Sequence, residues 1–521
     1  MAPLSRRRFA LAAAAVFAGG QPLRAQALPK DFDAYVTKAM QLFGVPGLAI
    51  GIVKDGKVVL AKGYGVRRLG DPTPVDAHTL FQIASNTKAY TAAALAMLAD
   101  SGRLQWDDPV QHYIPEFQLW DPWVTREFTI RDALTHRSGL GLGAGDLLWF
   151  HSTYTSADMI KRFRYLKPVT SFRSQFAYDN VLYMVAGQVV VAVTGKPWGD
   201  FIRTRIFAPL GMREAWTSIS EVPAGANIAA AHAKLDGVLQ VVPYDTSDNI
   251  QAAGMLVENV TDATKWLLVQ LDSGRYAEGG GRLWSAKRAR EMWSAQTILP
   301  LGNPPPPLAG LRANFAAYGL GWGIRDYHGY KLLNHTGGLD GMTSQTMLIP
   351  EQRLGLVVFT NAEQPIFAAL GYRILDAFLG VPPTDWAAAF KAVSGTGEAS
   401  ADSVLRHQDS TRARGTTPSL PLAGYAGRYT DSWYGDATIA PEGDHLVLRF
   451  SASPAFVGDL EHWHHDVFVA HWRRRNIPDA FVSFALNPDG SIEQFKMEAR
   501  SPLADFSFDY QDLLFVPAPA H

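Results

Sequence analysis

A serine and a lysine stand three residues apart in the segment FQIASNTKAYTAAALAMLADSG, residues 81–102. A serine hydroxyl becomes a nucleophile when a neighbouring base accepts its proton. Residues three apart share one face of a helix, so the Lys88 amine can reach the Ser85 hydroxyl. A helix start also offers free backbone N–H groups that stabilise negative charge. The pair therefore has the geometry for catalysis, although serine is also a common helix N-cap.

Lys88 needs an unusual environment if it is to act as a base. An ordinary lysine has a pKa of about 10.4 and is protonated at neutral pH. Burial lowers this pKa, and a tyrosine can share the proton. The segment SQFAYDNVLYMVAGQVV places Tyr178, Asp179 and Asn180 just before an apolar helical run. The sequence therefore offers Tyr178 as a proton-transfer partner, although an aromatic residue followed by an Asx helix cap would explain the same pattern without chemistry.

A third motif lies in LLNHTGGLDGMTSQTMLIP, where His335, Thr336, Gly337 and Gly338 precede a strand-like run. Glycines allow a backbone to approach a ligand closely. An extended edge beside a nucleophile can pair with the backbone of a substrate and direct an N–H group at its carbonyl oxygen. The motif is therefore a candidate substrate-binding edge.

In this order the three motifs resemble those of the serine β-lactamase and penicillin-binding clan, which combines S-x-x-K with a Lys-Thr-Gly strand. The Tyr-x-Asn form is similar to the class C branch, which includes class C β-lactamases, D,D-carboxypeptidases, D-aminopeptidases, esterases and amidases. The similarity covers about residues 31–380 and extends to segments such as FTIRDALTHRSGL, IFAPLGM and YGLGWGI. It implies an α+β fold, with an antiparallel sheet flanked by helices and an all-helical subdomain.

The resemblance also implies roles for the motif residues. Ser85 would be the acylated nucleophile, and Lys88 and Tyr178 would form the proton-transfer pair. Which of the two is the base stays open at this stage. Asn180 would orient Lys88 and contact the amide of the substrate. Water activated by Lys88 and Tyr178 would then release the acyl group.

For the third motif, the resemblance implies an oxyanion hole made by the backbone N–H groups of Ser85 and Gly338. It also implies substrate contacts from His335, Thr336 and Gly337. A lysine at position 335 would offer a fixed positive charge to a substrate carboxylate, whereas His335 would offer a smaller, pH-dependent charge. Resembling proteins with histidine here are more often D-aminopeptidases, other peptidases or esterases than efficient β-lactamases.

The elements that must position these residues follow from the hydrophobic pattern. Two strand-like runs meet at the turn residues 55–56, and helical patterns cover residues 87–98 and 181–193. A hairpin turning at residues 350–352 and an amphipathic helix over residues 366–379 follow. Strands at both ends of a segment with a helical centre predict one antiparallel sheet shared by its N- and C-terminal strands.

We predict a hydrolase domain over residues 28–380, followed by a linker over residues 381–420. The first part of this segment has a helical pattern, and the rest is rich in Ser, Thr, Gly and charged residues. Short strands separated by turn signals predict a small all-β domain over residues 421–521. In relatives of similar layout this domain is lipocalin-like, and it packs over the mouth of the active site or mediates assembly. We therefore expect it to gate substrates by size, and the resemblance also allows a homo-oligomer.

Residues 1–27 have the pattern of a cleaved export signal. Arginines 6–8 precede a short apolar run and resemble a twin-arginine signal, and Ala25-Gln26-Ala27 matches a cleavage site. The apolar run is shorter than the ~20 residues that span a bilayer, and no later segment is long enough. We therefore expect an exported chain, periplasmic or secreted, with no stable membrane anchor.

Composition excludes several other kinds of protein. The 521 residues are 47% hydrophobic and 19% charged with a net charge of −1, which argues against nucleic acid as a partner. The chain contains no cysteine, so it has neither disulfides nor a thiol nucleophile. It also lacks the GxSxG elbow of Ser-His-Asp hydrolases. We expect His136, in LTHRSGL, to satisfy loop backbone groups.

Four histidines near the C-terminus are candidate metal ligands, because two of them share one face of a predicted strand. They are His462, His464, His465 and His471. The chain lacks the HExxH motif and cysteine ligands, so we interpret this segment as a solvated strand face and expect neither a metal nor a cofactor.

Together these patterns predict an exported serine hydrolase that forms an acyl-enzyme on Ser85. We expect its substrates to be small molecules or short peptides with amide bonds, including peptides with D-configured or unusual residues. The first alternative is an esterase or a weak β-lactamase. The second is a penicillin-recognising or scaffold pseudoenzyme, although the presence of Ser85, Lys88 and Tyr178 together argues against it.

Overall fold

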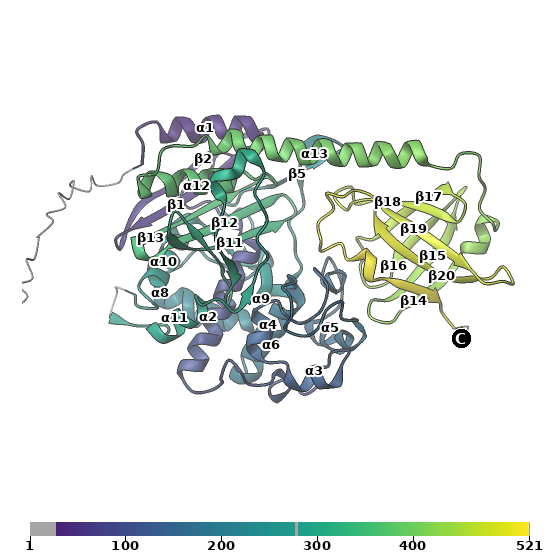
Figure 1. The fold of residues 1–521 in the computed structure, drawn as a ribbon, viewed down its shortest axis with the longest axis horizontal. Helices are drawn as coiled ribbons and strands as arrows, with labels where there is room; N and C mark the ends of the chain where they lie inside the picture. Colours follow the sequence, from purple (N-terminus) through teal and green to yellow (C-terminus); the bar gives the residue numbers. More distant parts are fainter. Residues whose placement is uncertain (1–27, 277–279, 520–521) are drawn as a thin grey trace, which may run out of the picture.

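The computed structural model describes residues 28–276 and 280–519, so the predicted export signal lies outside the described residues. An N-terminal α+β domain and a C-terminal β-barrel lie side by side, and one long helix connects them (Figure 1). This arrangement confirms the predicted fold class.

The core of the N-terminal domain is a nine-stranded antiparallel sheet. From edge to edge its strands are β3 (Asp71–Pro74), β2 (Lys57–Arg68), β1 (Gly47–Lys54), β13 (Leu354–Thr360), β12 (Met342–Ile349), β11 (Tyr330–Leu339), β10 (Gly323–Tyr327), β9 (Ala316–Tyr318) and β8 (Thr297–Ile298). The pairing of β1 with β13 confirms that strands from both ends of the domain share one sheet.

Helices cover both faces of this sheet, which explains why β1 and β13 are apolar at nearly every position. Alternate residues of β1, such as Leu48 and Ile50, pack with α1 (Phe32–Phe43) and α12 (Ile366–Leu379). The intervening side chains face α10 (Val260–Leu271) and the helical subdomain. Strand periodicity therefore separates two hydrophobic cores on the two sides of the sheet.

The helical subdomain is built around α2 (Thr87–Asp100), which is buried from Thr87 to Ala99. Its alanine-rich sequence lets neighbouring elements approach it closely from every side. It packs against α6 (Asn180–Thr194) and α9 (Gln251–Gly254). The remaining helices of the domain are α3 (Pro122–Glu127), α4 (Ile130–Leu134), α5 (Ser156–Arg162), α7 (Trp198–Ile202), α8 (Ala208–Leu210) and α11 (Ala286–Met292).

Two short ribbons complete the N-terminal domain. They pair β4 (Phe81–Gln82) with β7 (Val257–Glu258), and β5 (Ala231–Leu235) with β6 (Val238–Val242). Among the described residues, no single helix is long and apolar enough to cross a membrane. In the described part of the chain, one bent pair, α6 and the segment Trp198–Leu210 at 73° to it, together has the length and apolar composition of a span.

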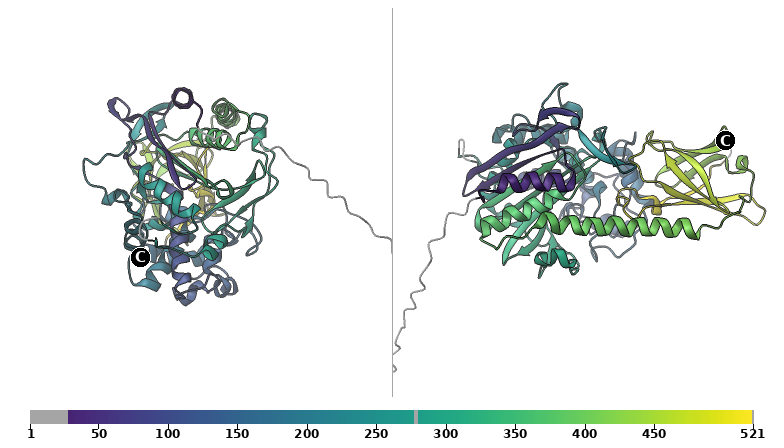
Figure 2. Two further views of the ribbon diagram at one scale, coloured as in Figure 1. Left: turned by 90° about the vertical axis from the view of Figure 1, so that its left-hand side faces the viewer. Right: turned by 90° about the horizontal axis from the view of Figure 1, so that it is seen from above.

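The segment expected to be a partly helical linker contains α13 (Trp386–Thr411), a helix of 26 residues. Figure 2 shows it running along both domains. The Asp385 carboxylate caps its start by accepting from the Ala388 amide at 3.1 Å. At its end, Arg412 donates to the backbone carbonyls of His462 and Trp463 on the barrel. Contacts at both ends fix this helix, although most of its middle is exposed.

The C-terminal domain is a closed barrel of eight antiparallel strands. They are β14 (Gly427–Asp431), β15 (Gly435–Glu442), β16 (His445–Phe450), β17 (Val457–His464), β18 (Val467–Trp472), β19 (Ala480–Leu486), β20 (Ile492–Ala499) and β21 (Leu514–Pro517). Buried aromatic rings from different strands contact one another, for example Phe495 and Phe515 with ring centroids 4.7 Å apart. Large side chains therefore occupy the interior of this barrel.

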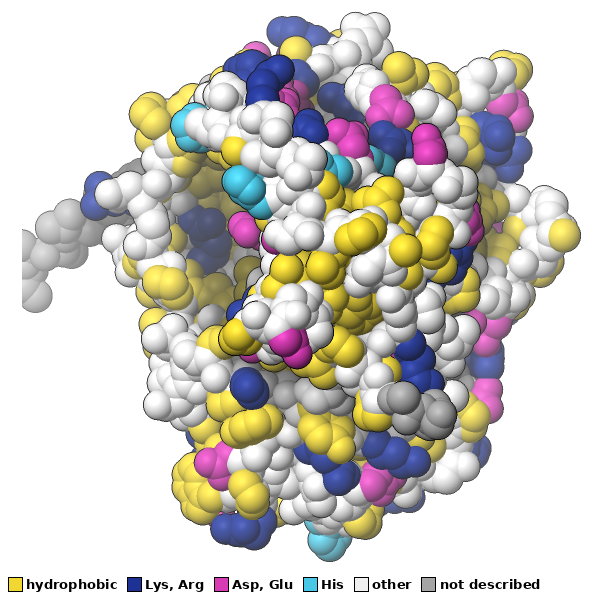
Figure 3. Space-filling model, turned by 90° about the vertical axis from the view of Figure 1, so that its right-hand side faces the viewer, with side chains coloured by type: hydrophobic (Ala, Val, Ile, Leu, Met, Phe, Trp, Pro, Cys, Tyr) yellow, Lys and Arg dark blue, Asp and Glu magenta, His cyan; other side chains and the backbone are white. Residues whose placement is uncertain are grey.

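The two domains share a hydrophobic contact. Phe150 of the helical subdomain packs against Phe456 and Phe508 of the barrel, with centroids 5.8 Å and 5.0 Å away. The Tyr154 hydroxyl donates to the Tyr434 carbonyl at 2.5 Å. On the face shown in Figure 3, acidic and basic side chains are interspersed, and hydrophobic side chains lie among them.

Candidate active site

Ser85 lies in η1 (Ala84–Asn86), the short 3-10 turn that leads into α2. The preceding residue, Ala84, has φ of 49°, a left-handed conformation that costs a non-glycine residue about 1–2 kcal/mol. Strand β12 holds this turn in place, because the Ser344 hydroxyl donates to the Ile83 carbonyl at 2.6 Å and accepts from the Asn86 amide at 2.7 Å. No sequence pattern indicates these contacts, since Ser344 is 258 residues from Asn86.

Neither Ser85 nor Asp179 acts as an ordinary helix cap. The N-cap of α2 is Asn86, and no side chain caps the helix there. The Asp179 side chain likewise makes no cap hydrogen bond at α6. The Ser85 hydroxyl instead accepts from Lys88 Nζ at 2.9 Å. The explanations of these motifs by helix capping alone are therefore wrong.

Lys88 is completely buried beneath Ser85. Besides its bond to Ser85 Oγ, its Nζ donates to Asn180 Oδ1 at 2.7 Å and to the Ala253 carbonyl at 2.9 Å. Burial lowers the pKa of the Lys88 ammonium to about 7, and the Asp146 carboxylate acts in the opposite direction. Lys88 can therefore lose its proton near neutral pH, as a general base must.

Asp146 is a buried part of this network that the sequence analysis missed. Asn180 joins it to Lys88, because the Asn180 amide donates to Asp146 Oδ2 at 2.7 Å. The same oxygen accepts from the hydroxyl of Ser507, a barrel residue, at 2.9 Å. Burial raises the pKa of Asp146 to about 7, and these hydrogen bonds oppose the rise. A lone Asp within the apolar run GAGDLLWF was the only sequence signal.

Tyr178 lies between His136 and the barrel. Its ring stacks on His136 at 4.3 Å and meets the edge of Phe506 at 5.7 Å. Burial raises the pKa of Tyr178 well above its usual value, while hydrogen bonding with the Ser85 hydroxyl opposes the rise. His136 Nδ1 accepts from the Asp179 amide at 3.0 Å, which confirms that this histidine satisfies a loop backbone group.

His335 does not provide the positive charge that the sequence analysis expected. It is 7% exposed, and burial lowers its pKa to about 3. The Thr336 carbonyl can only accept, so His335 Nδ1 carries the proton of their 2.7 Å hydrogen bond. His335 Nε2 is then the acceptor of the 2.8 Å bond from the Tyr318 hydroxyl. His335 is therefore neutral, and its immediate role is to fix the strand.

The glycines of β11 place the strand against the nucleophile. A methyl group at Gly337 would lie 2.3 Å from the Ile83 carbonyl and 2.9 Å from Ala84 Cβ. A methyl group at Gly338 would meet nothing within 4 Å. Strand β10 pairs with β11 only as far as Asn334, so the following residues carry no paired strand on that side. This arrangement suits the predicted substrate-binding edge.

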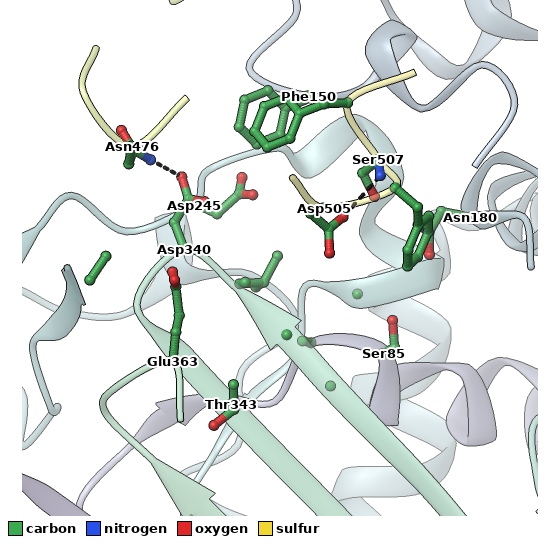
Figure 4. Close-up of a pocket in the computed structure, with 18 of the residues that line it drawn as sticks. Ser85, Phe150, Asn180, Asp245, Asp340, Thr343, Glu363, Asn476, Asp505 and Ser507 are labelled. Atoms are coloured by element: carbon green, nitrogen blue, oxygen red, sulfur yellow. Dashed lines mark hydrogen bonds between the residues drawn. The ribbon is translucent and has the colours of Figure 1, made fainter. Parts of the chain in front are cut away.

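A cavity of about 790 Å³ brings the predicted residues together (Figure 4). Its lining includes Ser85, Tyr178, Asn180 and residues 335–338, while Lys88 lies behind Ser85. The barrel loop around residues 503–508 lines the same cavity. The sequence could not place this loop here, because the contact depends on how the two domains pack.

Across the part of the chain that the structure describes, no group of three or more His, Asp or Glu side chains could hold a metal ion. The histidines of β17 and β18 have other partners. His462 Nε2 bonds to the His465 carbonyl at 2.9 Å, and His471 Nδ1 lies 2.7 Å from Asp479.

Comparison with known proteins agrees with this geometry. A sequence profile described as Beta-lactamase matches residues 32–379. The chain belongs to the Beta-lactamase family. A second profile, described as a domain of unknown function (DUF3471), matches residues 411–517. The barrel therefore corresponds to a separately defined domain.

Individual relatives of this Beta-lactamase family member are hydrolases and penicillin-binding-like proteins. Unguisins hydrolase ungD of Aspergillus violaceofuscus is 29% identical over 476 residues, which are 85% of this chain and 83% of that protein. The octameric penicillin-binding protein homologue from Pyrococcus abyssi has a TM-score of 0.60 at 22% identity, covering 93% of this chain and 99% of that one. D-amino acid amidase from Ochrobactrum anthropi, solved with L-phenylalanine, has a TM-score of 0.55 at 24% identity, with 67% and 97% covered. The family and the unguisins hydrolase support a serine hydrolase, and the two solved structures share its fold.

Proposed function

We propose that this serine hydrolase cleaves amide bonds of small peptides through an acyl-enzyme on Ser85. The observation that carries the proposal is the buried Lys88, whose pKa is lowered to about 7 and whose Nζ lies 2.9 Å from the Ser85 hydroxyl. The names of two relatives, a hydrolase of unguisins and a D-amino acid amidase, support an amidase. Peptides with D-configured or unusual residues are therefore the first substrates to test.

Lys88 is the base in this proposal. The Asn180 side-chain oxygen and the Ala253 carbonyl can only accept hydrogen bonds. A neutral Lys88 amine has two hydrogens, and both are held by these acceptors. Its lone pair is then directed at the remaining partner, the Ser85 hydroxyl. Lys88 takes the Ser85 proton while Ser85 Oγ attacks the carbonyl carbon of the substrate.

Tyr178 acts as an acid rather than as the base. Its raised pKa keeps the phenol protonated at neutral pH. As the amide C–N bond of the tetrahedral intermediate breaks, the phenol donates its proton to the leaving nitrogen, and the proton on Lys88 restores the phenol. Backbone N–H groups of Ser85 and Gly338 stabilise the oxyanion, each worth about 3–4 kcal/mol. Water then attacks the acyl-enzyme by the same proton transfers.

The decisive experiment measures the hydrolysis of D- and L-aminoacyl amides, short peptides, p-nitrophenyl esters and a chromogenic cephalosporin. The wild-type protein and its Ser85→Ala variant are compared. We expect amide hydrolysis that is lost in the variant, and mass spectrometry should detect an acyl group on Ser85. Fast turnover of the cephalosporin without amide hydrolysis would overturn the proposed substrate class. Full activity of Ser85→Ala would overturn the mechanism.

We also propose that the protein acts outside the cytoplasm, on the strength of residues 1–27 alone. Fractionation of cells that express the full chain, followed by sequencing of the mature N-terminus, tests this proposal. Cleavage after Ala27 is expected. An intact N-terminus in the cytoplasmic fraction would contradict it. A homo-oligomer stays a prediction that light scattering can test.

A further inference from the structure

The cavity that contains Ser85 has an acidic wall (Figure 4). Four carboxylates line it and come from separate parts of the chain. Asp245 follows β6, Asp340 forms the turn between β11 and β12, and Glu363 follows β13. Asp505 comes from the barrel loop. The proposed acyl transfer uses none of these residues.

Asp245 is the member of this wall that most clearly lacks a partner. Its residue is 1% exposed, and its Oδ1 accepts from the Ser247 amide at 2.9 Å. Its Oδ2 is buried and has no hydrogen-bond partner among the described residues. An unpaired buried carboxylate oxygen is costly, because it loses water without gaining a donor. His151 acts on this carboxyl without forming a hydrogen bond to it, so the Asp245 oxygen can still accept from a cationic or N–H donor.

The cations near the wall already have acidic partners, and two of them act on Asp340 of the wall itself: Arg474, and His151, whose Nε2 lies 3.6 Å from Asp340 Oδ2. Arg474 and Asn476 of the barrel bind Asp340 at 3.2 Å and 2.5 Å. Two basic residues line the cavity, but Lys234 pairs with Glu398 and Arg475 pairs with Asp236.

Among the described residues, the other three carboxylates of the wall form no ion pair, although His151 influences Asp245 from a distance. Over the described parts of the chain, no ion pair is recorded for Asp245, Glu363 or Asp505. Burial raises the pKa of Glu363 to about 7, and Asp340 and Asp505 raise it further. Burial also raises the pKa of Asp245, with Asp340 adding to the effect and His151 opposing it. The carboxylates therefore oppose one another's ionisation, and a bound cation would relieve this repulsion.

We propose that this acidic wall is a subsite that binds a primary ammonium group of the substrate, held by Asp245 and Glu363, while Ser85 attacks a carbonyl group across the cavity. This inference rests on the proposed function and names the substrate class of the same site. An organic ammonium fits better than a metal ion, because no three of the described carboxylates or histidines are grouped closely enough to hold one. The ammonium is either the α-amine of a peptide or the amine of a lysine-like side chain.

Three substitutions remove the charge of the wall and keep its backbone contacts. Asp245→Asn retains the oxygen that accepts from Ser247, and Glu363→Gln retains the oxygen that accepts from the Gly341 amide. Asp505→Asn retains the acceptor for the Ser507 amide at 2.9 Å. Glu493→Gln, at an exposed barrel position, is the matched control.

The test compares kcat/KM for two pairs of amides. Phenylalaninamide and N-acetylphenylalaninamide differ only at the α-amine, and N-acetyllysinamide and N-acetylnorleucinamide differ at the side-chain amine. In the double variant Asp245→Asn/Glu363→Gln we expect at least about a tenfold loss for one ammonium substrate and less than about a twofold change for its neutral partner. The pair that responds identifies the source of the ammonium. Equal losses within both pairs, or no loss, would overturn the proposal.

A binding measurement separates this inference from the proposed function. Calorimetry on the full-length Ser85→Ala protein measures binding of the same four amides. One outcome is that the wild type hydrolyses none of these amides, while Ser85→Ala binds the ammonium ligand and stops binding it once Asp245→Asn/Glu363→Gln is added. That result supports the ammonium subsite and contradicts the proposed amidase activity. If amides are hydrolysed but the amine ligands and their neutral partners bind equally well, the result contradicts the ammonium subsite and supports the amidase activity. If the double variant does not fold, the single variant Glu363→Gln, at an exposed position, provides the same comparison.

Discussion

Lys88 is the residue whose protonation state controls the proposed reaction. It must be neutral to accept the proton of Ser85, and its pKa is lowered to about 7. We therefore expect kcat/KM for a neutral amide substrate to be low below pH 6 and to rise as the pH passes through about 7. A Lys88→Arg variant keeps the charge but cannot lose a proton, so it should be at least about 100-fold less active at every pH. A pH-independent rate in the wild type would contradict this assignment.

Asp146 gives a second prediction at the residue scale. Its carboxylate favours the charged form of Lys88 through the bridge formed by Asn180. Asp146→Asn removes this charge, so the pKa of Lys88 should fall and the rising limb of the pH profile should move to lower pH by roughly one unit. The pH dependence of kcat/KM measures the shift, and Asp489→Asn on an exposed barrel turn is the control. A shift to higher pH would show that Asp146 acts in another way.

At the residue scale, the sequence indicates which residues belong to the site better than it indicates their burial, partners and protonation states. Ser85 and Lys88 were predicted as a pair because their spacing reflects local helix geometry, and the role of Tyr178 was predicted from the resemblance to a known family. The neutral state of His335 could not be found in the same way, since it depends on burial and on Tyr318 in another strand. Asp146 was missed for the same reason, because its partners arrive from α6 and from the barrel.

At the scale of elements, the approach of β11 to the turn that holds Ser85 depends on Gly337. A Cβ atom there would lie 2.3 Å from the Ile83 carbonyl and 2.5 Å from Ser344 Oγ, both of which fix the turn. Gly337→Ala should therefore lower the free energy of unfolding by about 1–3 kcal/mol and displace the nucleophile. Chemical denaturation measures the loss of stability.

Gly338→Ala is the control for this prediction, because its methyl group would extend into open space. We expect its free energy of unfolding to stay within about 0.5 kcal/mol of the wild type. Equal destabilisation by the two substitutions would mean that general stiffening of β11, and not contact with the turn, is responsible.

Most elements that position the site could be predicted from the sequence, because their signals are local. The turn at residues 55–56, the hairpin at Pro350–Gln352 and α12 all occur where the pattern indicated. Helix α13 was only partly predicted, because Ser, Thr and Gly are frequent in its middle, from residue 394 to residue 403. Contacts at its two ends, with Tyr35 and with the barrel, stabilise this helix. A local sequence pattern cannot predict such contacts, because the partner residues are far away in the chain.

At the scale of the whole molecule, the barrel contributes directly to the site. It supplies one wall of the cavity and places the ring of Phe506 against Tyr178. The Gly145 amide also donates to Asp509 of the barrel at 2.7 Å, next to Asp146. The sequence predicted two domains and a barrel near the mouth of the site. It could not predict that a barrel hydroxyl reaches the hydrogen-bond network of Lys88.

The contact between Ser507 and Asp146 therefore predicts that the barrel affects the pKa of Lys88. The Ser507 hydroxyl stabilises the ionised form of Asp146, so its removal should raise the pKa of that carboxyl. A less ionised Asp146 supports the charge of Lys88 less strongly, which lowers the pKa of Lys88. In Ser507→Ala the rising limb of kcat/KM should thus move to lower pH, by no more than the shift of about one unit expected for Asp146→Asn.

Two comparisons isolate this coupling. Ser483→Ala, at an exposed barrel position, should leave the pH profile unchanged. In a protein that already carries Asp146→Asn, adding Ser507→Ala should cause no further shift, because the carboxylate through which Ser507 acts is gone. A full additional shift in the double variant would show that Ser507 acts on substrate or on Tyr178 instead. If the shift disappears when Asp146 is replaced, the barrel is part of the catalytic unit. The hydroxyl of Ser507, a barrel residue, then influences the pH at which Ser85 is activated.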